Sequence, residues 1–318
     1  MPDQDILSRF PPVSMTLLET NKAAFARQLG RSFREFGFAA ISDHGLDEDL
    51  IARAYAKAAE FFALPEATKM KYFIEGGGGA RGYTPFGTEK AKDAEVHDLK
   101  EFWHVGRDLP EGHALSEFMA PNVWPDEVEG FRETFSELYA AFEAAGGRIL
   151  EAIALHLDLP RDFFAATVED GNSVMRLLRY PPLKGAEAEG AIRAAAHGDI
   201  NTITLLLGAE EAGLELLTAE DEWLAVDPPE GALVVNIGDM LDRLTNGRLR
   251  STTHRVVNPT GEAAYRARYS MPFFLHFRPD YMIETLDSCV DAENGETGPE
   301  PISSHDFLMQ RLREINLA

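Results

Sequence analysis

Cysteine is nearly absent from this sequence, and that scarcity excludes several kinds of protein. Cys289 is the only cysteine among 318 residues, so neither an internal disulfide nor a cluster of thiolate metal ligands can form. Long apolar runs are missing too, because no stretch approaches the roughly 20 residues of a membrane-spanning helix. The polar start, MPDQDILSRFPP, does not resemble a secretory signal peptide. We therefore expect a cytoplasmic protein without a membrane partner.

Positive charge is scarce as well. The chain has 30 lysines and arginines against 53 aspartates and glutamates, which gives a formal net charge of −23. Such a surface repels phosphate backbones, so we expect no nucleic-acid partner. A small anionic ligand would need a local basic group inside a pocket. The chain is long enough, and with 45% hydrophobic residues apolar enough, to bury a large core. Nothing in it indicates the oligomeric state.

Helical periodicity dominates the first half of the chain, which has neither a repeat of fixed period nor a low-complexity linker. Apolar residues recur at helical spacing in three stretches, and a short strand is predicted between the first two. The helical stretches are 19–36, 47–63 and 126–158, and the strand is 36–41. Four glycines at 76–79 cannot hold regular structure, so they predict a loop.

After Gly171 the period changes to that of β-strands. Short β-rich runs separated by Gly, Pro, Asn and Asp indicate a jelly-roll or sandwich. The runs are 174–180, 203–207, 214–217, 223–226, 232–237, 252–257 and 267–277. We predict a mainly β protein with added helices (α+β), in which helices flank a jelly-roll core. The expected segments of one compact unit are 1–115 (helices and strand), 116–170 (helical), 171–280 (the core) and 281–318 (a tail with a helix at 303–315).

Two His-x-Asp motifs could contribute metal ligands, and secondary structure separates them. His156 and Asp158 end the long predicted helix, where residues two apart point to nearly opposite sides. His197 and Asp199 follow an extended run, where residues two apart share one face and can reach one ion. We therefore expect a plain helix end at the first motif and metal ligands at the second.

A third ligand is needed, and His254 supplies a candidate inside the predicted strand 252–257. A jelly-roll brings such distant strands side by side. Two imidazoles and one carboxylate leave three positions of a metal open, a geometry that serves non-haem Fe(II) oxygenases. A 2-oxo acid that chelates the iron would also need a buried cation for its far carboxylate. Arg268, with Ser270 on the same strand face, fits that requirement.

In this order the residues resemble the isopenicillin N synthase-like family of 2-oxoglutarate- and iron-dependent oxygenases, over roughly residues 8–280. The similar segments are HGDINTITLL at 197–206, GLEL at 213–216, Trp223, LVVNIGDM at 233–240, LTNGRLRSTTHRV at 244–256 and RYS at 268–270, preceded by 34–45, 81–83 and 98–102. The resemblance implies a double-stranded β-helix core. It also implies that His197, Asp199 and His254 bind the iron.

The resemblance implies a reaction as well. Dioxygen takes four electrons, of which decarboxylation of 2-oxoglutarate to succinate supplies two and the substrate supplies two. Hydroxylation of a small molecule is the expected outcome, with desaturation or ring closure as variants. Arg268 and Ser270 would hold the far carboxylate of the cosubstrate, and Tyr180 matches a family tyrosine near it. Plant members carry Asn two residues before that tyrosine where this chain has Leu178, and we hypothesise that Arg176 compensates.

Strand alternation predicts further residues of the pocket. If the side chain of Arg268 points inward, Phe274 and His276 share its face and line the substrate side. The alternative places His276 beyond the barrel rim, in solvent. Arg81 and Tyr83, beside the glycine run, are predicted to form a lid over the substrate. The remaining candidates receive structural assignments: His44 a structural role, His97, His104 and His113 a solvated loop, and Asn236 and Asp239 a turn.

Two alternatives stay open at this point. An oxidase like isopenicillin N synthase itself would take all four electrons from its substrate, and would grip a substrate carboxylate with Arg268 and Ser270. A non-catalytic jelly-roll binding protein would carry a vestigial site, although all three ligands and the arginine are present. Cosubstrate binding separates the first alternative from the main prediction, and metal-dependent turnover excludes the second.

Overall fold

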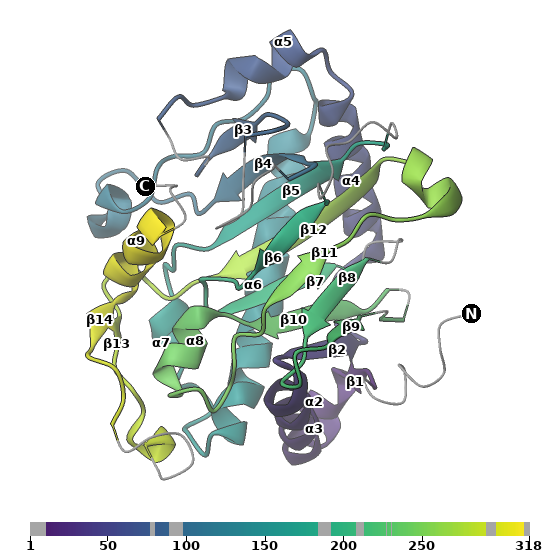
Figure 1. The fold of residues 1–318 in the computed structure, drawn as a ribbon. Helices are drawn as coiled ribbons and strands as arrows, with labels where there is room; N and C mark the ends of the chain where they lie inside the picture. Colours follow the sequence, from purple (N-terminus) through teal and green to yellow (C-terminus); the bar gives the residue numbers. More distant parts are fainter. Residues whose placement is uncertain are drawn as a thin grey trace.

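Two β-sheets that face each other form the centre of the molecule (Figure 1). The computed structural model describes residues 11–76, 80–88, 98–183, 192–207, 213–226, 228–229, 231–290 and 297–314. The strands of the larger sheet are β1 (Val13–Ser14), β2 (Phe38–Ser42), β10 (Leu233–Ile237), β7 (Ile203–Leu207), β12 (Arg268–Leu275), β5 (Val174–Tyr180), β4 (Glu101–Gly106) and β3 (Gly82–Thr84), in spatial order. Those of the smaller sheet are β6 (Ala194–His197), β11 (His254–Val256), β8 (Leu214–Leu217) and β9 (Trp223–Ala225).

Helices and one short hairpin surround the two sheets. The hairpin pairs β13 (Met282–Ile283) with β14 (Ile302–Ser303). The helices are α2 (Thr16–Thr20), α3 (Lys22–Phe36), α4 (Glu48–Phe62), α5 (Glu66–Lys69), α6 (Phe131–His156), α7 (Ala165–Val168), α8 (Asp239–Leu244) and α9 (Ser304–Glu314). Short 3-10 turns are η1 (Met70–Tyr72), η2 (Ala114–Glu117), η3 (Gly261–Tyr265) and η4 (Asp287–Cys289).

The two sheets are held face to face by apolar side chains. Phe38 and Val234 of the larger sheet share a buried cluster with Leu214 and Leu216 of the smaller sheet. Successive strand residues point to opposite faces, so each sheet gives one face to this contact. Neighbouring strands are antiparallel apart from β1 and β2. The arrangement is the double-stranded β-helix, which confirms the prediction of a mainly β jelly-roll core with added helices.

The outer face of the larger sheet is covered by α6, which runs behind the strands in Figure 1. Its buried residues recur every three or four positions, among them Phe135, Leu138, Phe142 and Ile149, and they form one apolar stripe. Phe142 stacks on Phe273 of β12 with 5.3 Å between ring centroids. Helices α3 and α4 pack against α6 in turn. The largest apolar core therefore lies on this side and leaves the opposite face of the sheet for the cavity between the sheets.

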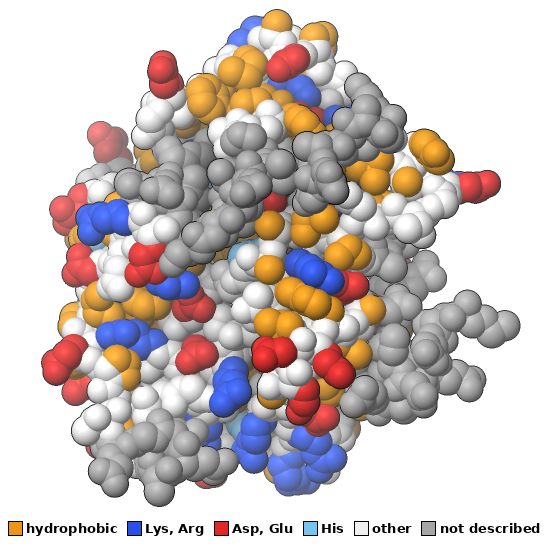
Figure 2. All heavy atoms as spheres, in the orientation of Figure 1, with side chains coloured by type: hydrophobic (Ala, Val, Ile, Leu, Met, Phe, Trp, Pro, Cys, Tyr) orange, Lys and Arg blue, Asp and Glu red, His pale blue; other side chains and the backbone are white. Residues whose placement is uncertain are grey.

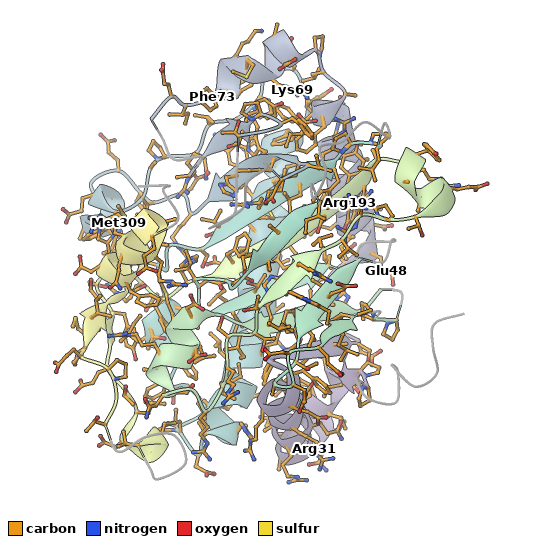
Figure 3. The ribbon with its side chains drawn as sticks, in the orientation of Figure 1. Arg31, Glu48, Lys69, Phe73, Arg193 and Met309 are labelled. Carbon is orange, nitrogen blue, oxygen red and sulfur yellow. The ribbon has the colours of Figure 1, made fainter. Side chains whose placement is uncertain are left out.

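The first half is mainly helical as predicted, but it also contains two strands that were not predicted, β3 and β4. All residues of β4 are buried, including Glu101 and His104, and β3 pairs with it. Glu101 can be buried because Lys69, labelled in Figure 3, and Arg179 both pair with its carboxylate. The prediction of a solvated loop around His104 was therefore wrong. The charged residues at 98–101 favour solvent exposure when the sequence is taken alone. In the structure they are buried, because Glu101 pairs with Lys69 and Lys100 pairs with Asp98.

The predicted helices and β runs match observed elements with small shifts. The run at 174–180 is β5, 203–207 is β7 and 214–217 is β8. The first helical stretch is divided at Asn21, whose side chain accepts a hydrogen bond from Ala24 N and begins α3. Gly37 ends that helix with a φ of 69°, a conformation that favours glycine. The long helix starts at Phe131 and ends at His156, so His156 and Asp158 form the expected helix end.

The described residues contain no helix that is both long and apolar enough to cross a membrane. On the face drawn in Figure 2, acidic and basic side chains are interspersed, and basic ones gather at the bottom of the view. In Figure 1 that region is α3, which carries Lys22, Arg27, Arg31 and Arg34. The acidic excess of the sequence is thus not uniform over the surface.

Adjacent glycines in α6 give a matched pair of substitutions. A Cβ added to Gly146 would lie 2.4 Å from Leu275 Cδ1 of β12, whereas one added to Gly147 would meet no atom within 4 Å. We expect Gly147→Ala to raise the free energy of unfolding by about 0.5–1 kcal/mol through helix propensity. Gly146→Ala should lower it, because overpacking costs about 1–3 kcal/mol. Denaturant unfolding of both variants measures this, and equal stabilities would contradict the close approach of α6 to β12.

Candidate metal centre

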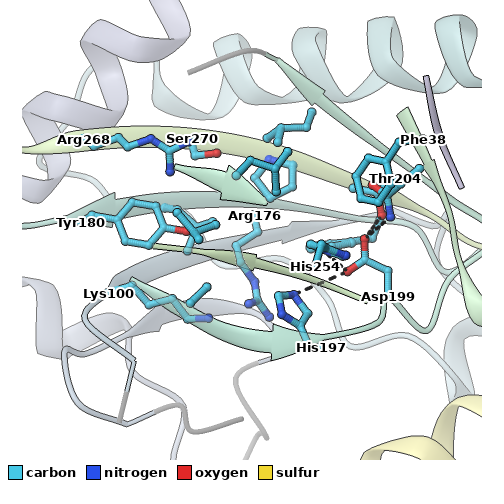
Figure 4. A pocket seen from close by; sticks show the side chains of 18 residues that line it. Phe38, Lys100, Arg176, Tyr180, His197, Asp199, Thr204, His254, Arg268 and Ser270 are labelled. Carbon is cyan, nitrogen blue, oxygen red and sulfur yellow. Dashed lines mark hydrogen bonds and ion pairs between the residues drawn. The ribbon is translucent and has the colours of Figure 1, made fainter. Parts of the chain in front are cut away.

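Three potential metal ligands converge where β6 and β11 pair (Figure 4). His197 ends β6, Asp199 lies two residues later, and His254 begins β11 directly opposite His197 in the antiparallel register. One ligand atom from each residue lies within 4.8 Å of the others. The Nε2 atoms of His197 and His254 are 3.9 and 3.8 Å from Asp199 Oδ1. The predicted ligands therefore share one site, although a long segment of chain separates them.

Backbone carbonyls orient both imidazoles. The Nδ1 atom of His197 lies 2.7 Å from Ala195 O, and that of His254 lies 3.1 Å from Thr252 O. In a neutral imidazole, an Nδ1–H that donates to a carbonyl leaves the lone pair on Nε2, which is the atom that can ligate a metal. Desolvation, and then the charge of His254, lowers the pKa of His197, so its imidazole is neutral at physiological pH.

The carboxylate of Asp199 is fixed by two hydrogen bonds from the larger sheet. Its Oδ2 accepts from Thr204 Oγ1 of β7 and from Asn236 Nδ2 of β10, the latter at 2.8 Å. Burial opposes ionisation of Asp199, but the electrostatic interactions with the nearby rings of His254 and His197 and these hydrogen bonds outweigh it, so the pKa of this carboxyl is lowered. Oδ1 is thereby the oxygen that faces the two imidazoles. Two imidazole nitrogens and one carboxylate oxygen on one side match the donor set of a non-haem Fe(II) site.

The cavity beside this cluster extends between the two sheets and contains a second constellation. Arg268 of β12 lies opposite Tyr180 of β5, with 5.3 Å between the guanidinium and the ring centroid, and Ser270 follows on the same face. Arg268 is 6% exposed, and its Nε and Nη1 atoms have no hydrogen-bond partner within the described residues. Buried donors without partners are costly, so this end of the cavity fits an anion such as a carboxylate.

The two residues predicted to line the substrate side differ in position. Phe274 lines the cavity, as strand alternation predicts. His276 lies just after the end of β12 and is not among the described residues that line the cavity. It is buried rather than solvated, so the alternative of an exposed rim position is wrong, and its place on the substrate side stays a prediction. Burial lowers the pKa of His276 to about 4, and its Nδ1 lies 3.0 Å from Phe274 O.

Arg81 and Tyr83 lie inside the protein rather than on a lid. Arg81 is 4% exposed and donates from Nε to Ala120 O. The hydroxyl of Tyr83 donates to Glu101, and neither residue lines the cavity. Both side chains are buried against β4, so the prediction that they form a lid was wrong. Gly77 to Gly79 and His97 lie outside the described residues.

Three further residues were assigned structural roles from the sequence, and for Asn236 that assignment missed a role in the site. His44 Nε2 lies 2.9 Å from Gly231 O, and His113 Nδ1 accepts from Leu115 N, so both anchor loops. Asn236 was assigned to a turn but lies in β10 and holds Asp199. The available signal was its place in the otherwise apolar run LVVNI, where an amide needs a polar partner.

The contact of Asn236 with Asp199 can be tested by metal titration. Asn236→Ala removes one of the two donors to Oδ2 and lets the carboxylate rotate. We expect the affinity of the metal-free protein for a divalent ion such as Co(II) to fall about 10- to 100-fold. Asn122→Ala is the matched control, because that amide binds Gly106 and Asp108 away from the cavity. Unchanged affinity in Asn236→Ala would show that Thr204 alone orients the carboxylate.

Two family models match the chain. Residues 10–127 match the N-terminal region of non-haem dioxygenases in morphine synthesis. Residues 171–277 match the 2OG-Fe(II) oxygenase superfamily. The second match spans β5 to β12 and so contains the three clustered residues and Arg268.

Individual proteins are similar over nearly the whole chain. A 2-oxoglutarate-Fe(II) type oxidoreductase of Emericella nidulans, hxnY, is 35% identical, and the match covers 90% of this chain and 83% of that protein. A crystal structure from Caulobacter crescentus, described as a 2OG-Fe(II) oxygenase family protein, is 56% identical with a TM-score of 0.90, covering 96% and 99% of the two chains. A full-length Neurospora crassa protein, crystallised in complex with alpha-KG and thymine, is 29% identical with a TM-score of 0.84, covering 96% of each chain.

Proposed function

Because the chain belongs to the 2OG-Fe(II) oxygenase superfamily, we propose that it couples decarboxylation of 2-oxoglutarate to hydroxylation of a small organic molecule in the cavity between its sheets. The chain is a 2-oxoglutarate- and Fe(II)-dependent oxygenase with the facial triad His197, Asp199 and His254. The observation that carries the proposal is the pairing of this triad with a buried cation in one cavity. The single buried cysteine, Cys289, supports a cytoplasmic location.

Each residue has a defined task in this proposal. His197, His254 and Oδ1 of Asp199 hold Fe(II), and Thr204 and Asn236 keep the carboxylate in one orientation. Arg268 and Ser270 bind the far carboxylate of 2-oxoglutarate, with Tyr180 beside it. When bound, iron and 2-oxoglutarate activate dioxygen and supply the two electrons that the substrate does not.

The walls of the cavity control access of water. Apolar side chains from both sheets, including Phe38, Leu206, Leu214 and Val256, line the space around the triad. A dry, rigid wall keeps the metal ligands in place and protects the reacting centre from solvent. Hydroxylation is the outcome that this arrangement supports by default. Desaturation and ring closure are variants that use the same metal ligands.

Anaerobic spectroscopy tests the proposal. Adding Fe(II) and then 2-oxoglutarate to the metal-free protein should give the weak visible charge-transfer band of a chelated keto acid. His197→Ala should abolish the band, because it removes one of three protein ligands. Iron binding without a band in the wild type would favour an oxidase that does not use 2-oxoglutarate.

Two arginines separated by one residue test the cosubstrate site. Arg268→Gln should raise the concentration of 2-oxoglutarate needed for half-maximal band intensity about 10- to 100-fold, because it removes a buried charge-assisted contact. Arg266→Gln is the control, since that side chain is 70% exposed and pairs only with Glu262 among the described acids. If both variants need the same concentration of 2-oxoglutarate for half-maximal band intensity, the cosubstrate carboxylate does not bind Arg268.

A further inference from the structure

Helix α8 contacts the ligand segment, residues 197–199, which carries two of the three metal ligands. The first residue of α8, Asp239, donates its backbone N–H to Asp199 O at 2.7 Å, and Met240 N donates to Asn201 O at 3.1 Å. Both acceptors lie between the end of β6 and the start of β7. The position of the ligand Asp199 therefore depends on where α8 begins.

The side chain of Asp239 reaches the residue between the two ligands. A Cβ added to Gly198 would lie 3.3 Å from Asp239 Oδ1 and 3.3 Å from Ser251 Oγ, a distance at which few side chains pack. Because position 198 is glycine, both polar groups can approach the ligand segment closely. Ser251 lies three residues before His254, the third ligand. Asp239 therefore lies at the junction of the chain segments that carry all three ligands.

The C-terminal helix α9 provides a counter-charge for Asp239. Arg311 Nη2 of α9 lies 3.1 Å from Asp239 Oδ2, and that oxygen accepts no hydrogen bond within the described residues. A second contact joins the two helices, because Phe307 of α9 is buried and the guanidinium of Arg243 of α8 lies 5.5 Å from its ring centroid. In Figure 1 both helices lie at the left of the view. The carboxylate of Asp239 thus connects α9 with the ligand segment.

The ion pair between Arg311 and Asp239 contributes little to folding. The two side chains are 36% and 16% exposed, respectively. Ion pairs with such access to water add only a small part of the free energy of unfolding. The position of this pair beside the ligand segment gives it another use, because groups that orient metal ligands from outside change the metal affinity when they are removed.

We propose that Arg311 is a positioning residue of the metal centre, and that through Asp239 it keeps the ligand segment in the conformation that binds the ion. The inference rests on the metal site of the proposed function and adds a residue of the C-terminal helix to it. The sign of the effect is specific. If the charge of Arg311 acted only through its field, removing it would strengthen the binding of a cation, whereas loss of a positioning contact weakens that binding.

A double-mutant cycle on the full-length protein measures this role. The wild type, Arg311→Gln, Asp239→Asn and the double variant are titrated metal-free with Co(II) in competition with a chelator, and denaturant unfolding of each metal-free protein is recorded. We expect Arg311→Gln to lower the affinity for Co(II) about 3- to 5-fold, an effect that a partly exposed ion pair can give. In the Asp239→Asn background the same substitution should have no further effect, because Arg311 acts through that carboxylate. Arg311→Lys should restore part of the affinity, and Arg313→Gln, exposed on the same helix, is the matched control and should leave it unchanged.

Other results would overturn the role of Arg311. Unchanged or tighter binding of Co(II) in Arg311→Gln would show that its contact with Asp239 does not position the ligands. A loss that persists in the Asp239→Asn background would assign the effect to another contact of Arg311, such as its ion pair with Glu314. A fall in the free energy of unfolding as large as the loss of binding free energy would make the role purely structural. Failure of the wild type to bind Co(II), or binding that survives His197→Ala undiminished, would instead reject the metal site and with it the proposed function.

Discussion

The antiparallel pairing of β6 with β11 is the contact on which the functional site depends. It sets His254 opposite His197, and the chain then turns so that Asp199 faces both imidazoles. These strands have only four and three residues, so their own ladder is short. Apolar packing between the sheets and the hydrogen bonds from Thr204 and Asn236 to Asp199 tie the site to the larger sheet. The geometry of the metal ligands therefore depends on how the two sheets pack together.

The polarity of the cavity is opposite to that of the whole protein. Excess acidic residues keep the surface negative, whereas the described lining gathers Lys100, Arg176 and Arg268 around a single carboxylate. Burying these cations is costly unless anions or rings compensate them. Asp98 compensates Lys100, and aromatic rings flank Arg176 and Arg268. In the proposed function, the far carboxylate of 2-oxoglutarate compensates Arg268, whose Nε and Nη1 atoms have no hydrogen-bond partner within the described residues.

Some predictions from the sequence were confirmed because they rested on local periodicity. Residues two apart share a face in a strand and not in a helix, and that rule alone separated His197 and Asp199 from His156 and Asp158. Other predictions were wrong where distant partners decide. The run around His104 and the side chain of Arg81 looked solvated or mobile because their compensating contacts, such as Lys69 with Glu101, come from other parts of the chain.

The sequence by itself determined the metal ligands and the jelly-roll core and predicted a cation for the cosubstrate, since motif order and strand period encode them in linear form. Only the tertiary structure decided which groups hold those ligands. Asn236 acquires its role through a neighbour across the sheets, because its amide donates a hydrogen bond to Asp199. Such contacts depend on strand register and on sheet packing, and neither is written in the spacing of residues along a single strand.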